Sequence, residues 1–221
     1  MQQIRTRIKI CGITNFSDAQ AAINAGVDAL GFVFYTPSKR AISISSAANF
    51  CSKLSPFVDK VGLFVDPLEL DVNNAVDQIP LSLLQFHGNE SPEFCEKFSI
   101  PYIKSIPMIV NGGEDGCSTN IEIIDKYLSL HRNAVGFLLD TYHSDLPGGT
   151  GIAFDWTSIK NISDKPIILA GGLNNKNILE AMRCVSPYAV DVSSGVESLP
   201  GKKDSKKILE FVQSVRTAEI P

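Results

Sequence analysis

Short runs of apolar, mostly β-branched residues alternate along the chain with stretches in which apolar residues have helical spacing. The apolar runs are Arg7–Ile13, Ala29–Tyr35, Lys60–Asp66, Leu83–Gly88, Tyr102–Met108, Val135–Asp140, Pro166–Gly172 and Tyr188–Gly195. Helices are expected over Asp18–Ala25, Ala47–Leu54, Leu68–Gln78 and Ser205–Val215. The apolar runs recur roughly every 26 residues, about the length of one strand followed by one helix.

Strands that alternate with helices predict a parallel sheet, and eight of them in 221 residues predict an α/β fold, a closed (β/α)8 or TIM barrel. An open, doubly wound sheet is the structural alternative, but no GxGxxG or P-loop sequence follows the first strand to support it. No linker divides the chain, so residues 1–221 are expected to form a single barrel domain. The turn-rich sequence Asn111–Thr119 predicts one flexible loop.

Composition and charge exclude several classes of partner. Apolar residues make up 44% of the chain and charged residues 20%, as is usual in soluble globular proteins. The formal charge is −4 and no basic stripe is present, which argues against a nucleic-acid partner. The chain shows no signal peptide and no apolar run long enough to span a membrane. These features predict a cytoplasmic protein with no membrane partner.

The cysteines do not form a framework of disulfides or metal ligands. There are five, Cys11, Cys51, Cys95, Cys117 and Cys184, and no two are spaced as a CxxC pair. Most free cysteines in such proteins are small buried apolar residues. Cys11 differs in its location, because the sequence "RIKICGIT" puts it where the first strand opens into a loop.

Several polar residues and glycines lie at predicted strand ends. The active site of a TIM barrel is built at the carboxyl ends of its strands. Those ends carry Cys11-Gly12, Asp66, His87-Gly88, Asp140, Gly171-Gly172 and Ser193-Ser194-Gly195, and Arg40 lies in the loop after the second strand. A thiol, carboxylates, an imidazole and a guanidinium on one face of a barrel indicate an enzyme.

Two glycine-containing turns predict a phosphate site. The sequences "AGGLN" and "SSGVE" follow the seventh and eighth strands, the usual phosphate-binding loops of this fold. Their small residues let backbone N–H groups approach an anion, so Gly171, Gly172, Ser194 and Gly195 are candidate substrate-binding residues. The alternative is that Gly171 and Gly172 only make a tight turn.

The alternation of side chains along a strand puts Cys11 on the same face as Lys9. If Ile8 and Ile10 face the helices, the lysine and the thiol face the barrel interior, where Asp191 of the neighbouring eighth strand also points. A nearby ammonium favours a thiolate, which a base or nucleophile requires. The alternative is a structural ion pair of Lys9 and Asp191 with Cys11 packed beside it, and the spacing alone does not decide between the two.

Asp140 is a candidate acid, because it follows the apolar sequence "VGFLL" and burial there would raise its pKa. The first and sixth strands lie on different walls of a barrel, so Cys11 and Asp140 could face each other across a substrate. His87 is either a substrate-binding residue or a hydrogen-bonded structural one.

Taken in order, these residues resemble the phosphoribosylanthranilate isomerases. The resemblance covers Lys9 to Asp204 and rests on "KICGIT", "GFVFYTPSKRAIS", "VGLFVD", "LQFHGNES", "LLDTYHSDLPGGTGIAFDW", "ILAGGL", "VDVSSGVES" and "PGKKD". It implies a (β/α)8 barrel and an Amadori rearrangement of a phosphosugar, N-(5-phosphoribosyl)anthranilate, with no metal and no cofactor. A monomer or a homodimer is expected.

The resemblance also implies roles for individual residues. Cys11 matches the family's general base and Asp140 its general acid, while Arg40 matches the arginine associated with the anthranilate carboxylate. The family pattern there reads Ser-Pro-Arg, whereas this chain has Ser38-Lys39-Arg40 with the proline earlier, at position 37. His87 and Asp191 are further candidate substrate-binding residues.

Three other interpretations fit the sequence less well. A histidine-pathway aminoaldose isomerase would be expected to carry an aspartate in place of Cys11, and an indoleglycerol-phosphate synthase a catalytic lysine–glutamate set. An inactive barrel kept as a binding or scaffolding subunit would tend to lose Cys11, Asp140 and Arg40, all of which are present.

Overall fold

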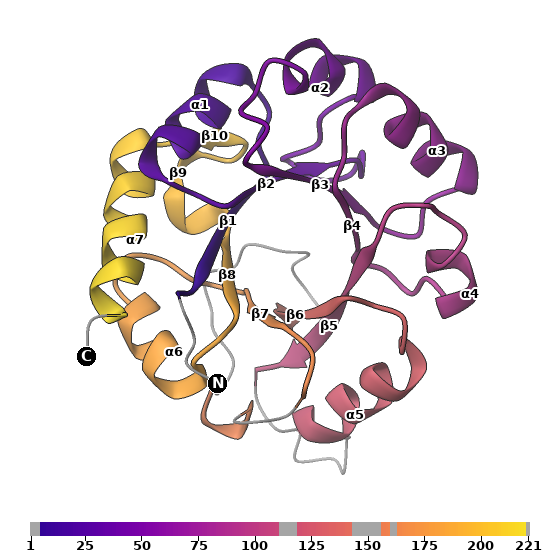
Figure 1. The fold of residues 1–221 in the computed structure, drawn as a ribbon. Helices are drawn as coiled ribbons and strands as arrows, with labels where there is room; N and C mark the ends of the chain where they lie inside the picture. Colours follow the sequence, from indigo (N-terminus) through magenta and orange to yellow (C-terminus); the bar gives the residue numbers. More distant parts are fainter. Residues whose placement is uncertain (1–4, 111–118, 143–155, 160–162, 220–221) are drawn as a thin grey trace.

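Eight parallel strands close into a barrel (Figure 1). The computed structural model describes residues 5–110, 119–142, 156–159 and 163–219. The strands are β1 (Arg7–Cys11), β2 (Ala29–Val33), β3 (Asp59–Phe64), β4 (Leu83–Phe86), β5 (Tyr102–Ile109), β6 (Gly136–Tyr142), β7 (Ile167–Leu169) and β8 (Ala189–Val192). Strand β1 pairs in parallel with both β2 and β8, which closes the sheet and rules out the open alternative.

Helices surround the barrel as an outer ring (Figure 1). They are α1 (Phe16–Ala25), α2 (Ile44–Cys51), α3 (Glu69–Gln78), α4 (Pro92–Cys95), α5 (Asn120–Leu130), α6 (Ile178–Val185) and α7 (Ser205–Ala218). Short 3₁₀ turns span Trp156–Ile159 and Ser194–Val196. In the described part of the chain, no helix has the length and apolarity needed to cross a membrane.

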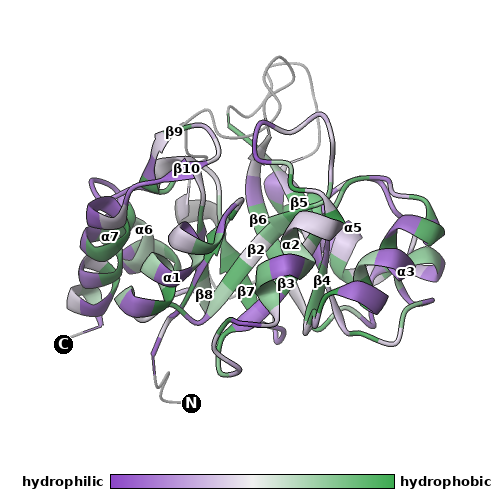
Figure 2. Ribbon diagram, turned by 90° about the horizontal axis from the view of Figure 1, so that it is seen from above, coloured by the Kyte–Doolittle hydropathy of each residue, from purple (hydrophilic) through white to green (hydrophobic). Residues whose placement is uncertain are grey.

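A small hairpin of two antiparallel strands, β9 (Glu197–Leu199) and β10 (Lys202–Lys203), lies between β8 and α7. The hydrophobic pattern did not predict it, because two short strands carry no clear periodicity. Figure 2 shows the hairpin at the end of the barrel opposite to both termini. It therefore belongs to the face formed by the carboxyl ends of the strands.

Local sequence signals set several helix ends. Asn15 caps α1 by accepting a hydrogen bond from the backbone of Asp18, so α1 begins at Phe16, two residues before the predicted start. Gly26 ends α1 as predicted, in a left-handed conformation with φ of 88° that glycine adopts without strain. Ser91 caps α4, with Pro92 at its first position.

The core has one part between the sheet and the helices and another part inside the barrel. Ile8 and Ile10 are fully buried against the helices, as the alternation predicted. Inside the barrel, one apolar layer consists of Ile103, Leu138, Ile168, Ala170 and Ala189. A second group, Cys11 with Val33 and Leu63, lies near the carboxyl ends. These layers fill the barrel and support the polar residues at its open end on the carboxyl side of the strands, called the mouth below.

Two sequence expectations concern segments at the mouth. Asp140 was expected to end the sixth strand, but β6 continues to Tyr142, so Asp140 is held within the sheet opposite Pro107 of β5. Of the expected flexible loop Asn111–Thr119, residues 111–118 lie outside the described residues. Thr119 caps α5 and forms a capping box with Glu122.

Candidate active site

The Cys11 thiol points into the barrel mouth, as the alternation along β1 predicted. Its neighbour in β2 is Gly31, and a Cβ atom at Gly31 would lie 2.8 Å from the Cys11 Sγ atom. Only a glycine therefore leaves room for the sulfur. The cysteine is 6% exposed, so its thiol is almost fully removed from bulk water.

Lys9 and Asp191 form a buried ion pair with 2.9 Å between Nζ and Oδ2, one step below the thiol in the barrel. Burial lowers the pKa of Lys9, but the Asp191 carboxylate outweighs burial, and the pKa of Lys9 is raised. Burial also raises the pKa of Cys11, and the charges of Lys9 and Lys203 offset this only in part. The expected ion pair is thus present. Lys9 lowers the pKa of the Cys11 thiol, as expected, but burial outweighs this effect and the thiol keeps its proton in the absence of a substrate.

One carboxylate oxygen of Asp191 accepts no hydrogen bond from the described residues. Its Oδ2 atom accepts from Lys9, whereas its Oδ1 atom is buried and has no partner among the described residues. A buried carboxylate oxygen without a donor is costly, so it suits a ligand group that donates a hydrogen bond. A sugar hydroxyl is such a group.

Arg40 lies directly over the backbone that follows Cys11. A Cβ atom at Gly12, where φ is 77°, would come within 2.7 Å of the Arg40 Cδ atom. The Nε and Nη2 atoms of the guanidinium each donate a 2.8 Å hydrogen bond to the Glu197 carboxylate. This pose could not be derived from the unusual sequence around Ser38, whose hydroxyl accepts from the Arg40 backbone.

Glu197 and Lys203 are site residues that the sequence reasoning missed. The Lys203 ammonium donates to Glu197 Oε1 at 2.9 Å and to the carbonyl and hydroxyl oxygens of Ser193 at 3.2 and 3.3 Å. Ser193 in turn donates to the Cys11 carbonyl at 3.0 Å. Both residues lie in motifs that carry the resemblance, Glu197 in "VDVSSGVES" and Lys203 in "PGKKD", but the lysine-rich run "GKKDSKK" is typical of a solvated surface and gave no reason to expect a buried lysine.

His87 and Asp140 meet on the other side of the mouth. The Nε2 atom of His87 lies 3.2 Å from Oδ2 of Asp140. Gln85 Nε2 lies 3.1 Å from His87 Nδ1, and because an amide nitrogen only donates, this contact corresponds to the tautomer with the proton on Nε2, the nitrogen nearer Asp140. Asp140 is 27% exposed, so the burial that the apolar sequence before it predicted is only partial.

A second buried ion pair holds the loop that carries His87. Lys104 donates to Glu90 Oε2 at 3.0 Å and to the Gly88 carbonyl at 2.7 Å. Glu90 also accepts from the backbone N–H groups of Gly88 and Asp66. Asp66, another predicted strand end, uses its own carboxylate on the backbone of Asn89 and does not join the group around Cys11.

The two glycine turns pack against each other and against β6. At Gly171, where φ is 80°, a Cβ atom would lie 2.2 Å from the Thr141 hydroxyl oxygen, and at Gly195 it would lie 2.0 Å from the Leu173 carbonyl. Gly172 also has a positive φ, of 67°. Gly171 makes no hydrogen bond with any described residue. The glycines thus let three backbone segments approach closely, and this packing is compatible both with an anion-binding turn and with turns that are only tight.

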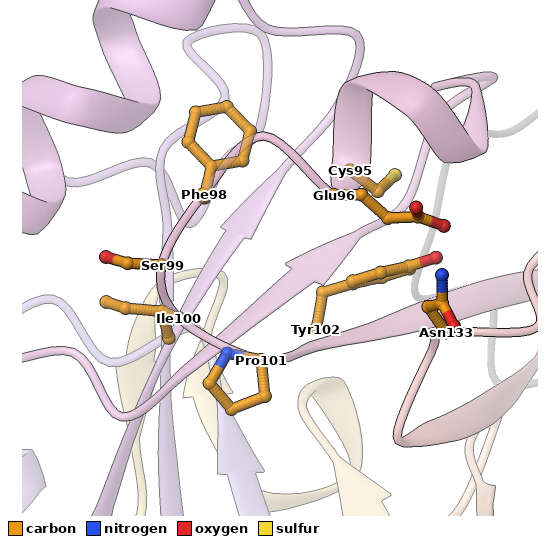
Figure 3. A pocket seen from close by; sticks show the side chains of 8 residues that line it. All are labelled: Cys95, Glu96, Phe98, Ser99, Ile100, Pro101, Tyr102 and Asn133. Carbon is orange, nitrogen blue, oxygen red and sulfur yellow. The ribbon is translucent and has the colours of Figure 1, made fainter.

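Two open hollows lie away from this face. One, of about 480 Å³, surrounds the start of β5 and is lined by residues such as Cys95, Tyr102 and Asn133 (Figure 3). The other, of about 300 Å³, lies between Arg5 and Glu219. Neither contains a predicted site residue, and both are at the amino ends of strands, whereas the active sites of TIM barrels lie at the carboxyl ends.

Comparisons with known proteins agree with this geometry. A family model described as "N-(5'phosphoribosyl)anthranilate (PRA) isomerase" matches residues 8–214. A protein of Pseudomonas syringae pv. tomato named N-(5'-phosphoribosyl)anthranilate isomerase is 47% identical over 209 residues, which are 95% of this chain and 97% of that protein. The crystal structure of phosphoribosyl anthranilate isomerase from Thermotoga maritima has a TM-score of 0.85 and 38% identity, covering 96% of this chain and 99% of that one. A phosphoribosyl anthranilate isomerase in complex with reduced 1-(o-carboxyphenylamino)-1-deoxyribulose 5-phosphate has a TM-score of 0.80 and 36% identity, with the same coverage.

Proposed function

Because the chain belongs to the N-(5'-phosphoribosyl)anthranilate isomerase family, we propose that it converts N-(5-phosphoribosyl)anthranilate to 1-(2-carboxyphenylamino)-1-deoxyribulose 5-phosphate in tryptophan biosynthesis. The observation that carries the proposal is the contact of Arg40 with Gly12, the residue after Cys11. It puts a cation for the ring carboxylate on the face of the barrel that carries a thiol able to take a proton from the sugar.

In the first step, Asp140 gives a proton to the furanose ring oxygen. The bond between C1 and that oxygen breaks, the nitrogen lone pair forms a C=N bond, and the ring opens to a protonated imine (iminium) that keeps its N–H. His87 supports this role, because its Nε2 atom lies 3.2 Å from Asp140 Oδ2, close enough to stabilise the carboxylate that remains.

In the second step, the Cys11 thiolate removes the proton from C2. The electrons of the C2–H bond form the C1=C2 double bond of an enolamine, and the iminium nitrogen takes up the electron pair of its double bond and becomes neutral. Tautomerisation, which moves the enol proton to C1, yields the ketone, so atoms and charge balance. The raised pKa of Cys11 makes its thiolate a strong base once formed, while Lys9 and Lys203 supply positive charge near it.

Binding of the substrate is assigned to groups around these two residues. Arg40 takes the ring carboxylate, and the unpartnered Oδ1 atom of Asp191 accepts from a sugar hydroxyl. The backbone N–H groups of the turns at Gly171-Gly172 and Ser194-Gly195 take the phosphate. The cytoplasmic location and the monomeric or homodimeric state remain predictions.

The proposal is tested by turnover with the purified chain. Incubation with N-(5-phosphoribosyl)anthranilate should remove the fluorescence of this substrate at a rate proportional to protein concentration, and the deoxyribulose product should appear in equal amount. Absence of turnover by a folded chain that still binds the substrate would support the scaffolding alternative instead. Absence of both binding and turnover would reject the assigned substrate.

A further inference from the structure

The β9–β10 hairpin carries two buried ionic side chains that the proposed chemistry does not use directly. The side chains of Glu197 and Lys203 are only 5% and 1% exposed. A buried charge is retained only where neighbours compensate for the loss of water. The groups that compensate the charges of Glu197 and Lys203 therefore indicate the role of the hairpin in the site.

Glu197 uses both carboxylate oxygens on cations. Its Oε1 atom accepts from Arg40 Nε and Lys203 Nζ, and more weakly from the backbone of Gly201 at 3.3 Å. Its Oε2 atom accepts from Arg40 Nη2. Burial raises the pKa of Glu197, but these donors outweigh it and the pKa is lowered, so the carboxylate is charged. Two cations share one anion, which leaves an excess of positive charge beside Cys11.

The two hydrogen bonds from Arg40 fix the plane of its guanidinium. Nε and Nη2 are on one edge of this planar group, and both are directed at Glu197. Among the described residues, none accepts a hydrogen bond from Nη1. The edge of the guanidinium formed by Nε and Nη2 is thus bound to Glu197, and the edge with Nη1 remains. A carboxylate that approaches this remaining edge meets donors whose direction is already set.

Lys203 ties this arrangement to the strand that carries the thiol. Its ammonium joins Glu197 to Ser193, whose hydroxyl holds the Cys11 carbonyl. The three acceptors around Lys203 require the charged form, although burial lowers its pKa. A continuous path of hydrogen bonds therefore links Arg40 to the backbone of Cys11.

The hairpin itself is anchored to two other loops of the mouth. Thr14 donates to the Gly201 carbonyl at 2.7 Å, and the backbone of Lys203 donates to Asp18 at 2.8 Å. A Cβ atom at Gly201, where φ is 79°, would lie 2.9 Å from the carbonyl oxygen of Lys39, next to Arg40. Figure 2 shows the hairpin on the same end of the barrel as the carboxyl ends of the strands.

We propose that Glu197 and Lys203 are positioning residues: Glu197 holds Arg40 so that its remaining edge receives the ring carboxylate, and Lys203 sets that edge relative to Cys11. This inference rests on the proposed function. It makes the hairpin a device for recognising the carboxylate, so that loss of Glu197 weakens discrimination between ligands with and without that group.

Two stable ligands separate this role from general stability. The first is the reaction product, 1-(2-carboxyphenylamino)-1-deoxyribulose 5-phosphate, with its ketone reduced to an alcohol. The second is the same reduced compound without the carboxylate on the ring. The dissociation constant of each is measured for the wild-type chain, Glu197→Gln and Glu197→Asp. The glutamine keeps the size of the side chain but loses its charge, whereas the aspartate keeps the charge but is one methylene shorter.

Both variants should lower the preference for the carboxylated ligand by about tenfold to a hundredfold, because a charge-assisted pair is lost or misaligned. Binding of the ligand without the carboxylate should change less than about twofold, and KM should rise more than kcat falls. In an Arg40→Ala background, Glu197→Gln should have no further effect on the preference. Glu219→Gln, which breaks an Arg–Glu pair at the other end of the barrel, is the matched control and should leave the preference unchanged.

The outcomes are distinguishable. If the wild-type chain does not prefer the carboxylated ligand, the proposed function is wrong and the inference fails with it. If the wild-type chain prefers it and both variants prefer it equally or more strongly, Glu197 only screens the charge of Arg40 and the positioning role alone is wrong. If Glu197→Gln does not fold, the comparison of Glu197→Asp with the wild-type chain decides.

Discussion

The Nε2 atom of His87 lies 3.2 Å from the Oδ2 atom of Asp140, and this contact crosses β5 to join the residue that follows β4 to a residue within β6. Gln85 fixes the tautomer of the imidazole from the other side. The sequence was compatible with two roles for His87, a substrate-binding residue or a hydrogen-bonded structural one. The geometry favours a third role, that of a donor that orients the proposed acid.

Replacement of His87 by phenylalanine, which keeps a ring but has no N–H group, should lower kcat by about tenfold to a hundredfold, with little change in KM. A polar contact with a charged group contributes about 1.5–3 kcal/mol, and this one acts on a group that changes charge during the proposed reaction. Steady-state kinetics on the folded variant check this. An unchanged kcat would make His87 a structural residue.

Replacement of Cys11 by alanine should lower kcat by about 10² to 10⁴, the usual contribution of a general acid or base, with a smaller effect on KM. Cys51→Ala and Cys95→Ala are the matched controls. Both are fully buried, but they belong to α2 and α4, outside the barrel and away from Cys11, so their replacement tests only the effect of losing a buried thiol. A folded Cys11→Ala variant with near-normal kcat would return this thiol to a packing role.

The value of kcat/KM should rise with pH on the basic side of neutrality. The proposed base works only when deprotonated, and burial raises the pKa of Cys11 above that of an ordinary thiol. The rising limb should therefore lie above about pH 8.5, the ordinary thiol value. A profile measured up to about pH 10 tests this, and the residual activity of Cys11→Ala should lack the limb. A limb centred well below pH 8 contradicts the expectation.

Gly171→Ala should raise KM at least about tenfold and weaken inhibition by inorganic phosphate. The added Cβ atom would lie 2.2 Å from the Thr141 hydroxyl oxygen at a positive φ, so the turn must shift and its N–H groups lose their direction. Gly26→Ala is the matched control, because it has the same left-handed strain, of about 1–3 kcal/mol, with no atom within 4 Å. Equal effects of the two substitutions on KM would remove the phosphate assignment.

The free energy of unfolding should fall as the pH is lowered from about 6.5 to 4, in part because of His131. Burial, assisted by the charge of Lys104, lowers the pKa of this histidine to about 4, while its ordinary value is 6.5. In that interval the unfolded chain binds a proton that the folded chain does not, which removes about 3 kcal/mol. His131→Phe keeps a ring stacked on Tyr127 and should show a correspondingly shallower dependence in urea unfolding. The same slope in both proteins would show that His131 does not titrate this way.

Much of the fold follows from the sequence because its determinants are local. The two-residue period of a strand puts Ile8 and Ile10 on one face and Lys9 and Cys11 on the other, and the closed barrel has the isoleucines against the helices and the other pair inside. The regular recurrence of strand and helix then requires a parallel sheet, and the limited length favours its closure. Strand ends were less certain, as Asp140 within β6 demonstrates, because neighbouring strands decide where pairing stops.

Only the tertiary structure decided which polar groups meet. The bonds from Arg40 to Glu197 and from Lys9 to Asp191 join residues 157 and 182 positions apart, and they exist because the barrel closes between β8 and β1. Lys203 stands in a lysine-rich run that looks solvated, yet it is buried because the hairpin supplies the acceptors that replace water. Hydrophobic periodicity determines which way a side chain faces, whereas register, closure and loop geometry determine what it faces.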